Sequence, residues 1–109
     1  MNEQVQAYIG KYPDDIINLF MQLRAIILES APCAPEETLW ARLPSYCTGT
    51  SFVRLIPFKD HINIEAKAVL LHKDALVDYK ITPKGMLQLY LGQAVPCDAL
   101  RRIFAETLA

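Results

Sequence analysis

The chain has 109 residues, of which 52% are hydrophobic and 21% charged, a composition typical of one folded domain. Its 11 Lys and Arg residues nearly balance 12 Asp and Glu residues, and the formal net charge of -1 excludes a strong overall field for nucleic acid. The sequence has neither a long uninterrupted apolar run nor a basic leader with an apolar core, which argues against a membrane partner. We therefore expect a single domain over residues 1–109, located in the cytoplasm.

The chain begins with two predicted helices. Apolar residues at helical spacing indicate a short helix over residues 2–11. A longer helix is expected after Pro13, because Asp14 and Asp15 place negative charge at the positive end of its dipole. Pro32 cannot continue this helix, which should end near residue 30.

Beyond residue 35 the pattern changes towards the alternation typical of strands. Residues 38–40 predict a short strand or turn leading to Pro44, and residues 47–50 predict a hairpin turn. Residues 51–58 are apolar at both alternate sets of positions, which predicts a strand buried on both sides. In residues 61–65 two isoleucines alternate with polar residues, which predicts a strand with one polar face.

The last third of the chain returns to helical spacing. A helix is expected over residues 67–79, a turn at residues 83–85 and a strand over residues 86–91, and Pro96 opens a final amphipathic helix. This order predicts an α+β fold, in which a mainly antiparallel sheet packs against several helices on one face. The opposite face is expected to be partly open, and a ligand or partner would dock there most easily.

Three cysteines, Cys33, Cys47 and Cys97, cannot all pair with one another, and none belongs to a Cys-x-x-Cys unit. Proline or aromatic residues stand near them, and no His or Lys adjoins them. We interpret them as structural thiols of a reducing compartment.

Histidine is the first residue type to consider for metal binding or proton transfer. His61 lies on the polar face of the predicted strand with Asn63 and Glu65, a grouping able to hold a metal ion. The same residues are also common on a solvated sheet face without a function. His72 lies in the predicted helix beside Lys73 and is interpreted as a surface residue.

Other chemical signals are weak. The pairs Asp14-Asp15 and Glu36-Glu37 offer oxygen ligands for a hard cation, but adjacent residues on a helix do not face each other, and a helix N-terminus and a solvated turn explain them. No Gly-x-Ser-x-Gly unit and no glycine-rich phosphate loop is present, so no spacing amounts to an enzyme signature.

Short segments that span nearly the whole chain stand in a distinctive order. They are Tyr8-Ile9 with Pro13, Glu37-Thr38-Leu39, Leu43-Pro44-Ser45-Tyr46, Phe58-Lys59-Asp60-His61-Ile62, Tyr79-Lys80, Lys84-Gly85-Met86-Leu87-Gln88-Leu89, and Val95-Pro96 with Leu100-Arg101-Arg102-Ile103. In order and spacing they resemble the YdhG-like family, a bacterial domain of unknown function.

The resemblance implies an α+β fold with a curved antiparallel sheet and packed helices. Some members of the family are described as frataxin-like iron chaperones, which implies ferrous iron as a cargo. By position, Tyr46, Lys59, His61, Lys84 and Gly85 fall in segments typical of the family.

Three features separate this chain from that pattern, and one of them is a hairpin around Gly49 that is one residue short. Ala41 and Arg42 stand where relatives carry an aromatic residue and glycine, and residues 63–66 replace a Gly-Phe-Tyr-Pro segment. Weak iron binding also relies on an acidic surface, whereas the net charge here is -1.

The leading hypothesis is a binding domain without catalytic residues. Its site would lie on the sheet face and include Tyr46, Lys59, His61, Lys84 and Gly85, holding a small ligand, a metal or a partner protein.

If the ligand is a metal, His61 and Glu65 are expected as ligands, joined by Asp60. If it is an anion, the lysines would supply the charge. The alternative hypothesis is a protein-protein interaction or oligomer-forming domain without a small ligand, in which Trp40, Phe52 and Tyr90 form an exposed apolar patch.

Overall fold

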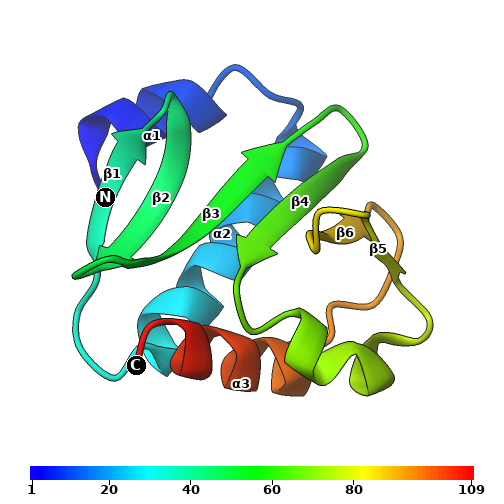
Figure 1. Ribbon diagram of the computed structural model, residues 1–109. Coiled ribbons are helices and arrows are strands. Elements are labelled where there is room, and N and C mark those ends of the chain that lie inside the picture. Colours follow the sequence, from blue (N-terminus) through cyan, green and yellow to red (C-terminus); the bar gives the residue numbers. More distant parts are fainter.

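Two helices open the chain in the computed structural model, which describes residues 1–109 (Figure 1). α1 spans Glu3–Ile9 and α2 spans Asp14–Ser30, close to the predicted bounds. The Asn2 side-chain oxygen caps α1 by accepting hydrogen bonds from the backbone N–H groups of Gln4 at 2.8 Å and Val5 at 3.1 Å. Pro13 directly precedes α2, as predicted.

Six strands form the sheet: β1 (Glu36–Trp40), β2 (Leu43–Thr48), β3 (Ser51–Pro57), β4 (His61–Ala66), β5 (Lys80–Ile81) and β6 (Leu87–Tyr90). They lie in the order β1-β2-β3-β4-β6-β5, and every neighbouring pair is antiparallel. The expected α+β class is therefore confirmed.

β2 is not predicted from the sequence, because Pro44 is expected to end the preceding segment. Pro44 stands at the second position of β2, and pairing with β3 begins only at Ser45. The missing N–H of proline is tolerated at such a position. A two-residue turn of Ala41 and Arg42, both with positive φ, joins β1 to β2.

The helix expected over residues 67–79 is wrong in extent and type. Only a short 3₁₀ helix, η1, spans Leu70–Leu76, and its backbone is kinked at His72. Leu71 is 77% exposed and Val77 is 78% exposed, so the apolar residues of this segment do not share one buried face. The short strand β5 after it was also not predicted.

The helices cover one face of the sheet. α3 (Cys97–Thr107) begins after Pro96 as predicted, and α2 passes behind the central strands while α3 lies along the end of β4 (Figure 1). The core between the layers is built from Phe20, Leu23, Ile27, Tyr46, Val53, Leu55, Ile62, Ile64, Leu87, Leu89, Leu100, Ile103 and Phe104, with smaller apolar neighbours. None of the helices combines the length and apolar character required to traverse a bilayer.

The other side of the sheet has no helix over it, and we call it the uncovered face. Strand register places on it the side chains of Thr38, Trp40, Ser45, Phe52, Arg54, Ile56, His61, Asn63, Glu65, Gln88 and Tyr90. The prediction that the strand at residues 51–58 is buried on both sides is therefore wrong. Val53 and Leu55 are buried under the helices, whereas Phe52 and Ile56 on the opposite side are only half-buried.

Candidate functional site

Arg54 organises one half of the uncovered face. Its guanidinium carbon lies 4.9 Å from the ring centroid of Trp40 and 4.8 Å from that of Phe52. The same guanidinium donates a hydrogen bond from Nη1 to Oε1 of Glu65 at 3.0 Å. Stacking on two aromatic rings and pairing with a carboxylate hold this long side chain against the sheet.

A stack of three rings occupies the other half of the uncovered face. The His61 ring lies between those of Phe58 and Tyr90, with centroid distances of 4.5 Å and 4.6 Å. Nδ1 of His61 lies 2.7 Å from Oδ1 of Asp60 in the turn that joins β3 to β4. The imidazole is thus fixed by two aromatic neighbours and one carboxylate, and only 14% of its side chain is exposed.

Two amide side chains lie between the Arg54 half and the ring stack. Asn63 of β4 and Gln88 of β6 are directly opposed in the strand register, with Ile56 of β3 on the far side of Asn63. Asn63 is 9% exposed, and its Oδ1 has no hydrogen-bond partner. Oε1 of Gln88 also lacks a partner. Buried amide oxygens are rarely left unpaired, so this pair is an unusual feature of the face.

Phe52 separates two hollows at the Arg54 end of the face. One hollow of 450 Å³ runs beside Trp40 and Cys47 on β1 and β2. The other, of 290 Å³, is lined by Glu65, by two lysines and by Gly85. Trp40 and Phe52 therefore border concave regions of the uncovered face.

The structure places Tyr46 away from the other predicted site residues. Its side chain is fully buried on the helix side of the sheet, and its hydroxyl donates to Oε2 of Glu37 at 2.7 Å. Burial raises the pKa of this hydroxyl above its ordinary value. Tyr46 is therefore a core residue. The prediction of a solvated turn at Glu37 is wrong, because Glu37 lies on β1 with a side chain only 11% exposed.

The other predicted residues divide between the two ends of β4. Lys59 and Asp60 lie in the turn beside His61, whereas Lys84 and Gly85 line the 290 Å³ hollow near Glu65. Residues four apart on a strand share a face but stand about 13 Å apart. The expected single cluster of an imidazole, an acid and two ammonium groups is thus not formed.

This separation also bears on the predicted metal ligands. Asp60 and His61 are in contact, but Glu65 lies at the far end of β4 and pairs with Arg54. No group of three or more His, Cys, Asp and Glu side chains is arranged to hold a metal ion. Asp60, His61 and Glu65 therefore do not form a three-ligand metal site.

Of the three cysteines, only Cys47 lines a hollow of this face, and His72 lies on η1. All three cysteines, Cys33, Cys47 and Cys97, are free thiols. Burial raises the pKa of the Cys47 thiol, which disfavours its reactive thiolate form. Nε2 of His72 lies 2.7 Å from Oε2 of Glu106 on α3, so this histidine ties η1 to the last helix.

Sequence reasoning missed the roles of Arg54, Asn63 and Gln88. The signal for Arg54 was its position at the centre of an otherwise apolar strand. The sequence indicates Asn63 only as a neighbour of His61 on one strand, and nothing local in the sequence indicates that Gln88 lies beside it.

Comparison with models of protein families, with curated proteins and with solved structures finds no match to this chain. The similarity to the YdhG-like family therefore remains an expectation from the sequence.

Proposed function

We propose that this chain is a binding domain that holds an extended segment of a partner protein across the uncovered face. The observation that carries the proposal is the pair of amides at Asn63 and Gln88, whose oxygens are buried without partners. Both oxygens are enclosed in the free protein, so a donor from a partner would reach them once the two side chains turn outward, and this contact would recover the free energy that an unpaired buried acceptor costs. Amide side chains both donate and accept, so they match the N–H and C=O groups of a peptide backbone.

The aromatic residues on either side of the amides favour a protein segment over a small ion. Trp40 is 52% exposed and Phe58 is 42% exposed, and they lie in the two halves of the face. Exposed Trp and Phe side chains are enriched at protein–protein interfaces, where they pack against partner side chains. A segment centred on the amides would reach apolar rings on both sides.

The charges on the face argue against a polyanion. Arg54 is already paired with Glu65, and the net charge of the chain is -1. Iron delivery, the role implied by the family resemblance, is not part of the proposal, because His61 and Glu65 do not share a site.

The proposal is tested by selecting peptides from a random displayed library and titrating them into the isotope-labelled protein. We expect side-chain amide resonances of Asn63 and Gln88 and the indole resonance of Trp40 to shift. Asn63→Ala should weaken binding about tenfold or more, since it removes a buried hydrogen-bonding group. Lys73→Ala on the exposed η1 segment is the matched control and should bind unchanged. Peptides whose shifts map to the helix side would refute the proposal.

The alternative to a partner protein is a second copy of this chain bound to the same face. Light scattering at high concentration distinguishes it, because a partner-binding domain of this kind is expected to remain monomeric on its own. A dimer that Trp40→Ala dissociates would show that a second copy, not a different protein, occupies the face.

A further inference from the structure

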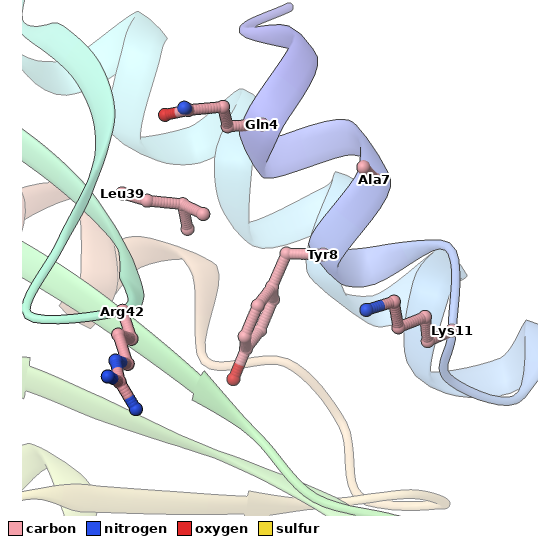
Figure 2. A pocket seen from close by; sticks show the side chains of 6 residues that line it. All are labelled: Gln4, Ala7, Tyr8, Lys11, Leu39 and Arg42. Atoms are coloured by element: carbon pink, nitrogen blue, oxygen red, sulfur yellow. The ribbon is translucent and has the colours of Figure 1, made fainter.

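The helix side of the molecule carries another hollow, whose lining includes neither amide of the pair. It has a volume of 640 Å³ and lies between α1 and the turn that joins β1 to β2. Its lining residues are Gln4, Ala7, Tyr8, Lys11, Leu39 and Arg42 (Figure 2). Tyr8 projects from α1 into this space, and Arg42 lies across from it on the hairpin (Figure 2).

The polar groups of this hollow carry positive charge or donate hydrogen bonds. Lys11 and Arg42 supply two cations, no carboxylate lines the hollow, and neither cation takes part in any of the ion pairs of the protein. The Tyr8 hydroxyl lies 3.3 Å from that of Tyr12. Burial and this neighbour raise the pKa of Tyr8 to about 12, so its phenol keeps its proton at neutral pH.

The backbone at Arg42 is held in a costly conformation. Ala41 has φ of 52° and Arg42 has φ of 65°, in the left-handed region that favours glycine. The two-residue turn between β1 and β2 requires this conformation, and it presents the guanidinium at the rim of the hollow. Ala7 and Leu39 add apolar surface beside the charged groups.

We propose that this hollow binds a small phosphate monoester with an apolar body. Two cations without carboxylate partners give the hollow a positive charge that suits a phosphate group, which carries close to two negative charges at neutral pH, and Arg42 can bind that group with two parallel hydrogen bonds. Gln4 and Tyr8 add neutral hydrogen-bonding groups, and Leu39 contacts the apolar body. The site includes neither the amide pair nor Arg54, and Leu39 is the one lining residue that it shares with the 450 Å³ hollow of the uncovered face.

The test is a calorimetric titration of the protein with phenyl phosphate, followed by mapping of the amide resonances of α1 and the hairpin. We expect saturable binding, weaker binding of inorganic phosphate because the apolar contact is lost, and weaker binding of phenylacetate because it carries one charge. Inorganic phosphate or phenylacetate that binds as tightly as phenyl phosphate would overturn the assignment, as would shifts that map outside the hollow.

Two glycine variants distinguish the effect of the Arg42 charge on binding from the effect of relieving backbone strain in the turn. Arg42→Gly removes the guanidinium and relieves the strain of a positive φ, so the variant should remain folded. Its affinity for phenyl phosphate should fall about tenfold or more. Ala41→Gly relieves the neighbouring φ and keeps both cations, so it should bind as the wild type does. Equal binding by the two variants would rule out a role for Arg42.

Discussion

The Tyr46 hydroxyl on β2 donates a 2.7 Å hydrogen bond to Oε2 of Glu37, the residue opposite it on the neighbouring strand β1. The same carboxylate accepts a hydrogen bond from Nε of Arg24 on α2 at 2.6 Å and from the backbone N–H of Asn2 at 2.7 Å. One carboxyl group therefore connects β1, β2, α2 and the start of α1.

Tyr46→Phe should lower the free energy of unfolding by about 2 kcal/mol, since a hydrogen bond to a charged group is lost in a buried setting. Urea unfolding followed by circular dichroism measures this change. Tyr90→Phe is the matched control, because the Tyr90 ring stacks on His61 on the uncovered face, and it should change stability by less than about 0.5 kcal/mol. Equal effects of the two variants would contradict the role assigned to the Tyr46 hydroxyl.

Glu37 predicts a specific dependence of stability on pH. Burial raises the pKa of this carboxyl, but hydrogen bonds from Arg24, Asn2 and Tyr46 outweigh burial and hold it below the ordinary value of 4.5. The stabilisation is therefore complete above the pKa of the unfolded chain and is lost as pH falls through the lower pKa of the folded state.

Glu37→Gln should consequently be much less stable than the wild type at pH 7, and the difference should shrink below pH of about 4. Thermal unfolding at a series of pH values measures it. Glu3→Gln alters an exposed carboxylate and should leave the pH profile unchanged. A gap between Glu37→Gln and the wild type that widens in acid would contradict the sign.

The two hairpin turns should respond in opposite ways to the exchange of alanine and glycine. Ala41→Gly relieves φ of 52° and should raise the free energy of unfolding by about 1 kcal/mol. Gly49→Ala imposes a side chain at φ of 60° with no atom within 4 Å of the new Cβ, so strain alone should lower it by about 1 kcal/mol. Chemical unfolding of both variants tests the pair, and a stabilised Gly49→Ala would contradict the strain argument.

Asn63→Val should make the protein more stable while abolishing partner binding. The substitution removes a buried amide oxygen without a partner and introduces a residue that favours strands, which should add about 1 kcal/mol. Thr38→Val on the edge strand β1 of the same face is the control, with an expected change below about 0.5 kcal/mol. A destabilised Asn63→Val would indicate that the amide supports the fold instead of a ligand.

Local patterns in the sequence were sufficient for the elements whose burial has a regular period. The helix after Pro13, the final helix after Pro96 and the strand at residues 61–65 all lie close to their predicted bounds. Each has one apolar face, and such a face appears directly as a repeat of about 3.6 or 2 residues. The segment at residues 67–79 failed because its apolar residues are spread over exposed and buried sides.

The sequence by itself therefore determined an α+β chain with an antiparallel sheet, helices on one side and a polar side to β4. Only the tertiary structure decided that Tyr46 is buried with Glu37, that Asn63 opposes Gln88, and that Arg54 lies beside Trp40. These relationships depend on strand order and register between segments distant in the chain. Periodicity reports which side of an element is apolar, whereas strand pairing in the folded sheet determines which side chains meet.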